Sequence, residues 1–257
     1  MIRKRSVKIL LLRRSYLLIL AALVLAGGIF WIVSWPAAVH TAAAQRQLPI
    51  YSVEREQKVC SISFDAAWGN EDTQALIDIL DHYGVNATFF VVGDWVDKYP
   101  ESVKALSDAG NEVMNHSSSH AHFSTLSTAQ ILDDVTVCNK KIEAITGVSP
   151  TLFRCPYGEY DDHVISAIRS LGMTPVQWDM DSLDWKGISA DEIRDRVLKR
   201  VQPGSIVLFH NAAEHTPEAL PGIIEALQAD GYTIIPISQI LLEGDTWIDN
   251  TGRQWAK

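Results

Sequence analysis

Between residues 58 and 237, short apolar segments alternate with amphipathic ones in a regular order that few architectures can satisfy. Seven segments are rich in β-branched and aromatic residues, a composition that favours strands. They span 58–65, 87–92, 111–115, 152–156, 174–180, 205–210 and 232–237. Six segments between them repeat apolar residues at helical spacing. They span 71–83, 95–108, 127–145, 161–170, 189–200 and 216–229. This alternation predicts a parallel α/β architecture, either a doubly wound sheet or an incomplete barrel.

The N-terminal residues combine a basic segment with a long uncharged run. Residues 1–14 hold six Lys or Arg residues and no acid, and residues 15–35 carry no charge. About 20 apolar residues span a bilayer core as a helix, and basic residues before the run keep the N-terminus in the cytoplasm. We therefore expect a transmembrane anchor at 15–35, a linker at 36–57, and the rest of the chain outside the cell membrane. A cleavable signal peptide is the alternative, because residues 37–45 are rich in small side chains.

The charge of the remaining chain excludes one class of partner. Of 22 Lys and Arg residues, six precede residue 15, which leaves 16 against 31 acidic residues and a net charge of −15. Nucleic acid binding needs clustered Lys and Arg, so we expect no nucleic acid partner. The sequence has no G-x-x-x-x-G-K-[ST] motif for nucleotide and no G-x-S-x-G elbow of a serine esterase. Cys60, Cys138 and Cys155 have no metal-type spacing and are expected to be buried.

Polar and ionisable residues follow five of the seven expected strands. Asp65 and His210 each end a strand, and the other three strands lead into residues 115–120 (NHSSSH), 154–158 (RCPYG) and 179–185 (DMDSLDW). In parallel α/β proteins, function collects where the carboxyl ends of the strands meet the following loops. The sequence therefore predicts one site built from these five segments.

Two histidines in the first of these loops have the spacing of metal ligands. His116 and His120 are four residues apart, which on a helical turn places both imidazoles on one face. Imidazole suits Zn²⁺ and similar ions. A pair of surface or capping histidines is the alternative interpretation.

Four other residues have the chemistry of catalytic groups. Asp65 can act as a general base, ligate a metal or cap a helix. His210 can act as a general acid, because histidine titrates near neutrality, or it can be a core histidine. Asp184 can orient His210 and raise its pKa, or cap a loop. Arg154 can hold a carboxylate through its guanidinium fork, or lie on the rim. Convergence on one face favours the functional interpretation of all four.

The same five segments, in this order, resemble the motifs of the polysaccharide deacetylases, the NodB-homology domain of carbohydrate esterase family 4. The matching stretches are SFDAAWG (63–69), HSSSH (116–120), RCPYG (154–158), DSLDW (181–185) and LFH (208–210). The resemblance covers about residues 56–243, and residues 89–120 are similar in particular to the sporulation-associated, PdaB-type members of spore-forming bacteria. It implies a distorted, incomplete (β/α) barrel of about seven parallel strands over 58–243, followed by a C-terminal tail at 244–257.

The resemblance also implies an activity and roles for individual residues. The family hydrolyses N-acetyl groups on amino-sugar polymers, so peptidoglycan is the expected substrate, with the spore cortex as one source of it. Asp65 corresponds to the base, oriented by Arg154, and His210 to the acid that protonates the leaving amine, tuned by Asp184. His116 and His120 correspond to ligands of a divalent metal, zinc or another ion such as cobalt. The residues expected to bind substrate are Trp68, Tyr157, Trp185 and Leu208.

One position departs from the family pattern. The family places a second aspartate, the third metal ligand, where this chain has Ala66. Catalytic zinc sites normally have three protein ligands. Three interpretations follow: an active deacetylase with a weaker or different metal, a glycan-binding domain without hydrolysis, or a structural component of an envelope or spore assembly. The retained Asp65, histidines, Arg154 and Asp184 favour the first.

Overall fold

The computed structural model describes residues 16, 19, 22, 24–25 and 46–257. The expected basic segment 1–14, most of the expected anchor 15–35, and residues 36–45 lie outside the described residues. Among the residues that are described, no helix is long and apolar enough to cross a bilayer. The description below concerns the unit formed by residues 46–257.

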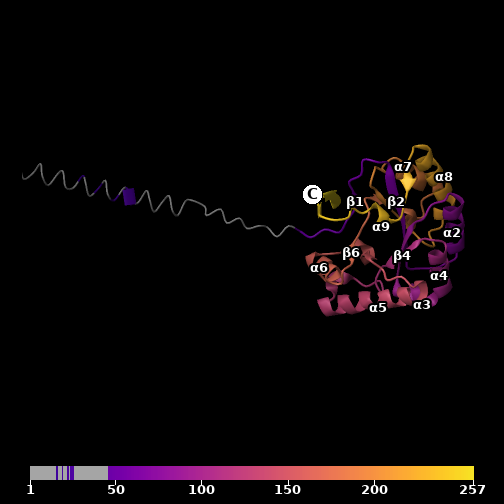
Figure 1. The fold of residues 1–257 in the computed structure, drawn as a ribbon, viewed down its shortest axis with the longest axis horizontal. Coiled ribbons are helices and arrows are strands. Elements are labelled where there is room, and N and C mark those ends of the chain that lie inside the picture. The colour runs from indigo at the N-terminus through magenta and orange to yellow at the C-terminus, as the bar shows by residue number, and fades with distance from the viewer. Residues whose placement is uncertain (1–15, 17–18, 20–21, 23, 26–45) are drawn as a thin grey trace, which may run out of the picture. The chain divides into compact units, whose positions relative to one another are not determined.

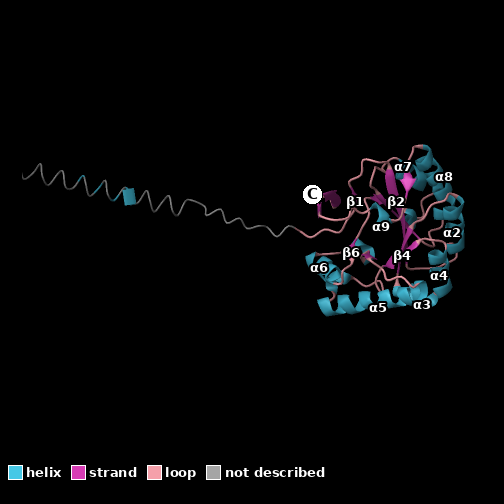
Figure 2. Cartoon of the chain, in the orientation of Figure 1, coloured by secondary structure: helices cyan, strands magenta, loops and turns pink. Residues whose placement is uncertain are grey.

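Strands and helices alternate along this unit in the order that the sequence predicts (Figures 1 and 2). The strands are β1 (Ser52–Val53), β2 (Val59–Ala66), β3 (Thr88–Val91), β4 (Glu112–Asn115), β5 (Leu152–Phe153), β6 (Thr174–Pro175), β7 (Met180–Asp181), β8 (Ile206–His210), β9 (Thr233–Ile234), β10 (Thr246–Ile248) and β11 (Arg253–Ala256). The α-helices are α2 (Thr73–His82), α3 (Gly93–Lys98), α4 (Pro100–Asp108), α5 (Thr128–Thr146), α6 (Asp162–Ser170), α7 (Ala190–Leu198), α8 (Thr216–Ala229) and α9 (Ile237–Ile240). Three short 3₁₀ turns are η1 (Phe123–Thr125), η2 (Pro156–Gly158) and η3 (Asp184–Lys186).

Seven parallel strands form one curled sheet, which confirms the expected incomplete barrel. Their order is β6-β5-β4-β3-β2-β8-β7, and β9 pairs with the start of β2. Figure 1 shows helices α6, α5, α3, α4, α2, α8 and α7 in turn around the outside of the strands. The strand ends that carry the predicted site residues therefore lie at one end of the barrel.

The barrel is open between β6 and β7, and the segment before β1 crosses this opening. The sequence predicts one strand at 174–180, which is wrong: the chain forms two short strands there, one at each edge of the sheet. Ile50 bridges Val176 between them, with its N–H 3.0 Å from the Pro175 carbonyl oxygen. Its own carbonyl accepts from the Gln177 N–H at 2.7 Å. Residues 46–57, expected to be linker, thus belong to the folded unit.

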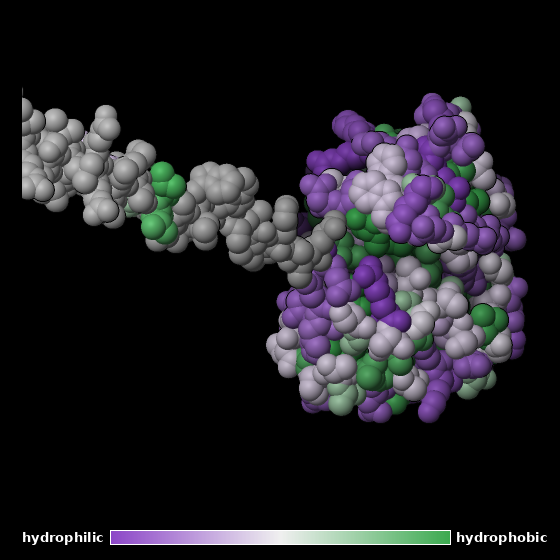
Figure 3. Space-filling model, turned by 60° about the vertical axis from the view of Figure 1, so that its left-hand side comes forward, coloured by the Kyte–Doolittle hydropathy of each residue, from purple (hydrophilic) through white to green (hydrophobic). Residues whose placement is uncertain are grey.

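Apolar side chains fill both faces of the sheet. On β2, Cys60, Ile62 and Phe64 face the cluster beneath the outer helices, where Phe64 stacks on Phe89. Serines and Asp65 occupy the alternate positions of β2, because successive side chains of a strand point to opposite faces. A second cluster that contains Phe90 lies around α9, and a third lies under α5 and α6. On the face in Figure 3, hydrophobic side chains gather in a hollow between hydrophilic surfaces.

The tail at 244–257 is an ordered part of the unit. Strands β10 and β11 pair antiparallel, and β11 pairs with β1 in a separate three-stranded sheet. Close packing fixes the neighbouring turn at Gly204, whose φ is +85° and whose N–H and carbonyl bond to Val59 and Val53. A Cβ at this position would lie 1.6 Å from the Val53 carbonyl oxygen, so only glycine fits.

Candidate active site

A cavity of about 370 Å³ opens at the carboxyl ends of the strands. The residues that line it are Asp65, Trp68, His116, His120, Tyr157, Gly158, Trp178, Asp181, Trp185, Leu208 and His210. Eight of these are site residues predicted from the sequence. The other two predicted residues, Arg154 and Asp184, are buried and contact Asp65 and His210. The five segments therefore form one site, as the strand-end argument predicts.

Asp65 and Arg154 form a buried ion pair at the floor of the cavity. The Arg154 Nη1 lies 2.7 Å from Asp65 Oδ1, and its Nη2 donates to the Ser63 hydroxyl and the Gln177 carbonyl at 2.9 and 3.1 Å. Burial alone would raise the pKa of Asp65, but the charges of Arg154 and the nearby histidines outweigh it and lower the pKa. Asp65 is therefore a carboxylate at neutral pH. Arg154 is its fixed partner and not a rim residue.

His116 and His120 meet at the cavity, but not on a helical turn. Residues 116–122 form a loop, and the two rings approach because Ser117 and His120 have positive φ angles of 74° and 56°. The Ser117 hydroxyl accepts the His120 N–H at 2.9 Å and fixes this turn. The ring centroids lie 5.0 Å apart. The sequence thus predicts the pairing correctly and the local structure wrongly.

The first imidazole is oriented by the backbone. His116 Nδ1 lies 2.8 Å from the Arg154 carbonyl oxygen, which only accepts, so Nδ1 carries a proton. Its Nε2 faces Asp65 Oδ2 at 3.4 Å. Burial lowers the pKa of His116, and it lowers the pKa of His120 to about 4 with the help of the His116 charge. Both rings are therefore neutral at physiological pH, with nitrogen lone pairs available.

On the other side of the cavity, Asp184 holds His210. Asp184 Oδ1 lies 2.8 Å from His210 Nδ1, and its Oδ2 accepts from the His210 N–H at 2.7 Å and from the Thr216 hydroxyl at 2.8 Å. Burial would lower the pKa of His210, but the hydrogen bond and charge of Asp184 outweigh it and raise the pKa. The raised pKa suits a proton donor near neutral pH. Thr216 was not predicted, because nothing in the sequence links the start of α8 to Asp184.

Exposed aromatic rings stand around the mouth of the cavity. Trp68, Tyr157 and Trp185 are 59%, 57% and 56% exposed, although large apolar side chains are usually buried. Tyr157 has a φ of 59°, a strained value for a residue other than glycine. Trp178 and Asp181 also line the cavity, and the predicted strand end at 174–180 was the signal that could have identified them.

Ala66 contributes no ligand atom to this cavity. It is 1% exposed and packs in the apolar cluster beneath the outer helices. Within the described residues, no group of three or more His, Cys, Asp or Glu residues is placed to hold a metal ion. His116 and His120 supply two imidazoles, and the nearest carboxylate, Asp65, is already paired with Arg154. The donor set therefore does not fit the three-ligand metal site of the family.

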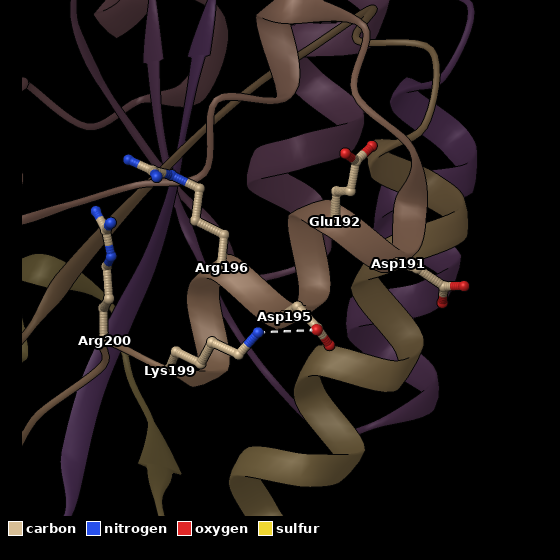
Figure 4. Close-up of a pocket in the computed structure, with 6 residues that line it drawn as sticks. All are labelled: Asp191, Glu192, Asp195, Arg196, Lys199 and Arg200. Atoms are coloured by element: carbon tan, nitrogen blue, oxygen red, sulfur yellow. Dashed lines mark hydrogen bonds and ion pairs between the residues drawn. The ribbon is translucent and has the colours of Figure 1, made fainter.

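A second hollow lies on the exposed surface of α7, whose residues stand between the fourth and fifth motif segments of the chain (Figure 4). Acidic side chains line its first part and basic side chains its second part, and Lys199 Nζ pairs with Asp195 Oδ2 at 3.0 Å. Arg196 points back to the sheet, where its Nε donates to the Asp181 carbonyl oxygen at 2.7 Å. The ion pair along this solvated helix is worth little energetically, and no catalytic groups converge in the hollow.

The family model and the similar curated proteins agree on one family. The sequence model of the family described as polysaccharide deacetylase matches residues 52–176. The peptidoglycan-N-acetylmuramic acid deacetylase PdaA of Bacillus subtilis is 31% identical over 197 residues, which cover 75% of each chain. PdaC of the same organism, also a peptidoglycan-N-acetylmuramic acid deacetylase, is 35% identical over 189 residues. That match covers 74% of this chain, which spans only 40% of the length of PdaC.

A similar solved structure is that of a CE4 family pseudoenzyme from Bacillus anthracis. It is 35% identical, superposes with a TM-score of 0.73, and the match covers 76% of this chain and 69% of that one. A mutant of the same pseudoenzyme with restored enzymatic activity is 36% identical, with the same TM-score. Both hydrolytic and non-hydrolytic proteins are thus similar to this chain.

Proposed function

This chain belongs to the polysaccharide deacetylase family, and on that premise we propose that its cavity binds an N-acetylated glycan such as peptidoglycan while Ala66 impairs hydrolysis. The observation that carries this proposal is a complete set of binding and proton-transfer residues beside an incomplete set of metal ligands. All ten predicted site residues lie in or directly behind the cavity. The position of the missing carboxylate is apolar and buried.

The shape and lining of the cavity support an amino-sugar ligand. Ligand pockets commonly have volumes of about 300–1,000 Å³, so 370 Å³ suits one sugar unit rather than a long segment. The exposed rings of Trp68, Tyr157 and Trp185 offer flat apolar surfaces on which sugar rings can stack. Asp65 and His210 offer hydrogen-bonding groups at the floor. Two relatives are named as peptidoglycan-N-acetylmuramic acid deacetylases, which favours peptidoglycan as the glycan.

An active deacetylase is the second candidate, and the two intact buried pairs favour it. The reaction needs water to attack the acetyl carbonyl, the C–N bond to break, and acetate and a free amine to leave. Asp65, held anionic by Arg154, has the charge to take a proton from that water. His210, held by Asp184, can donate a proton to the amine. The family resemblance implies zinc, cobalt or another divalent ion for this reaction, and the two imidazoles of His116 and His120 would hold such an ion more weakly than three protein ligands.

We also propose that residues 15–35 anchor the chain in the cell membrane, with the N-terminus in the cytoplasm and residues 46–257 outside. The support is the uncharged run and the six basic residues that precede it. This location would give the domain access to peptidoglycan. A role in the spore cortex, as in the PdaB-type proteins that the sequence resembles, is part of the same proposal. Protease treatment of intact cells, followed by detection of both ends of the chain, tests this orientation.

The binding proposal is tested by titrating the protein with N-acetylglucosamine oligomers and solubilised peptidoglycan in the presence of a chelator. We expect wild-type protein to bind without releasing acetate. Trp68→Ala and Trp185→Ala should each weaken binding about tenfold, the scale of a lost aromatic anchor. Trp247→Ala, which removes an exposed ring of the tail outside the cavity, is the matched control and should bind normally. Equal affinity in all four proteins would contradict binding in this cavity.

A further inference from the structure

We propose that Asn211 and Trp95 are positioning residues that fix Trp68 as a rigid wall of the cavity. The proposal rests on the proposed glycan function of that cavity and adds residues outside its lining to the recognition machinery. Trp68 lies in the loop between β2 and α2, and its ring is 59% exposed. Exposed loops are usually the mobile parts of a fold. Three peptide groups of this loop, at the Ala67 N–H and the Trp68 and Gly69 carbonyls, are hydrogen-bonded to buried side chains.

Asn211 makes three of these ties. Its Nδ2 donates to the carbonyl oxygens of Trp68 and Gly69 at 2.6 and 2.7 Å. Its Oδ1 accepts from the Ala67 N–H at 3.2 Å. The side chain is 4% exposed and uses both amide hydrogens and its oxygen on this one loop. Because all the hydrogen-bonding groups of the Asn211 amide bond to this one loop, they fix the conformation of the loop.

Trp95 reaches the same two carbonyl oxygens from the other direction. Its Nε1 lies 3.1 Å from the Trp68 oxygen and 2.6 Å from the Gly69 oxygen. The residue belongs to α3 and is 2% exposed. Each carbonyl therefore receives donors from two buried side chains that come from distant parts of the chain. Backbone carbonyls in loops are ordinarily satisfied by water or local turns, so this convergence specifies one loop conformation.

This clamp, formed by Asn211 and Trp95, also sets where Trp68 stands relative to the reactive groups. Asn211 directly follows His210 at the end of β8, so one short segment carries both the proton donor and the tie to Trp68. The Ala212 N–H adds a bond to Asp72 Oδ2 at 2.8 Å at the far end of the same loop. On the cavity side, the Trp68 ring meets His120 edge-on, with centroids 5.6 Å apart. A sugar stacked on Trp68 would thus be held at a fixed distance from His120 and His210.

A rigid wall matters because ordering a mobile side chain on binding lowers affinity. Immobilising one side chain costs about 0.5–1.5 kcal/mol, which corresponds to about 2- to 12-fold in affinity. Loss of the clamp should therefore weaken glycan binding by about this factor, through Trp68 alone. A merely structural role of Asn211 or Trp95 would lower stability and leave affinity unchanged in the protein that remains folded.

The test combines affinity with a probe of Trp68 itself. Full-length wild type, Trp95→Phe and Asn211→Ala are labelled with 5-fluorotryptophan and titrated with N-acetylglucosamine tetramer. The ¹⁹F signal of Trp68 is identified by its loss in Trp68→Phe. The Trp95 and Asn211 changes are then repeated in a Trp68→Ala background. Ser102→Ala removes a bond from Asn70 in the same loop and is the local control, while Ile168→Ala destabilises a distant cluster.

We expect Trp95→Phe and Asn211→Ala to bind about 2- to 12-fold more weakly and to shift and sharpen the Trp68 signal toward that of a mobile side chain. In the Trp68→Ala background neither change should weaken binding further, because both act through Trp68. Both controls should bind like wild type. An unchanged Trp68 signal, or equal weakening with and without Trp68, would overturn the clamp. Failure of wild type to bind any glycan would instead count against the proposed function, while the ¹⁹F signal of the free protein would still decide the clamp.

Discussion

Replacing Arg154 with methionine tests the buried ion pair at the centre of the site. The Arg154 side chain is fully buried and that of Asp65 is 7% exposed, with 2.7 Å between Nη1 and Oδ1. Methionine keeps much of the length and the contact that the guanidinium makes over the Phe90 ring, 4.1 Å from its centroid. The change therefore removes the charge and its donors more than it removes packing.

The expected loss of stability follows from leaving the Asp65 carboxylate buried without its partner. Breaking such a pair costs about 3–5 kcal/mol, against a total stability of about 5–15 kcal/mol for a domain. In wild type the folded pKa of Asp65 is lowered, so its contribution to the free energy of unfolding is present above the unfolded pKa and is lost as pH falls through the folded pKa. In the variant burial dominates and raises the folded pKa above the unfolded one. The variant should then be most destabilised at high pH and recover as pH falls.

Urea unfolding followed by circular dichroism measures this loss at pH 8 and pH 5. Asp65→Asn/Arg154→Met, which removes both charges, is the control and should be more stable at pH 8 than Arg154→Met alone. A deficit in Arg154→Met below about 1 kcal/mol, or one that is equal at both pH values, would refute the reasoning, because a buried unpaired carboxylate must show both effects.

Three further outcomes are expected. Gly204→Ala should lower the free energy of unfolding in urea by well over 2 kcal/mol, because its Cβ would meet a β1 carbonyl oxygen at 1.6 Å. The control Gly231→Ala has a similar φ of +84° but no atom within 4 Å of the new Cβ, and should lower it by about 1 kcal/mol. Asp184→Asn should lower the pKa of His210 in an NMR titration, since the Asp184 carboxylate raises that pKa against the effect of burial. In wild type the pair of Asp184 and His210 stabilises the folded protein below the unfolded pKa of His210, and this stabilisation is lost as pH rises through the folded pKa. Thr216→Val should cost about 1–2 kcal/mol in thermal unfolding by removing one donor to the Asp184 carboxylate, and unchanged stability would contradict that role.

Local sequence signals were sufficient for most of the fold. Apolar runs identified β2, β3, β4, β5, β8 and β9 but missed β1, β10 and β11, and residues 71–83 and 216–229 became α2 and α8 with shifts of a residue or two at most. The segment 95–108 became two helices, because the chain bends at Tyr99 and restarts at Pro100. The bridge between Ile50 and Val176 at the open side of the barrel could not be predicted, since it joins residues far apart in the chain.

The residues of the site also divide into those that the sequence predicted and those that only the structure revealed. Strand ends and motifs identified the residues that line the cavity, because parallel strands bring their carboxyl ends together whatever the sequence between them. Arg154 and Asp184, which hold Asp65 and His210, were predicted as well, but the further supporting residues Thr216, Asn211 and Trp95 came only from the structure. Thr216 starts a helix and Asn211 follows a strand, as many other polar residues do, and Trp95 has the pattern of an ordinary core residue. Their roles depend on which distant loop they face.

Acetate release from peptidoglycan and N-acetylglucosamine oligomers tests the central claim most directly. Wild type and Ala66→Asp would be compared with added zinc or cobalt and with chelator, alongside Ala66→Asp/His116→Ala. We predict no metal-dependent release from wild type, release from Ala66→Asp, and its loss in the double variant. Metal-dependent release by wild type that disappears in His116→Ala would contradict the claim that Ala66 impairs hydrolysis and would establish the deacetylase.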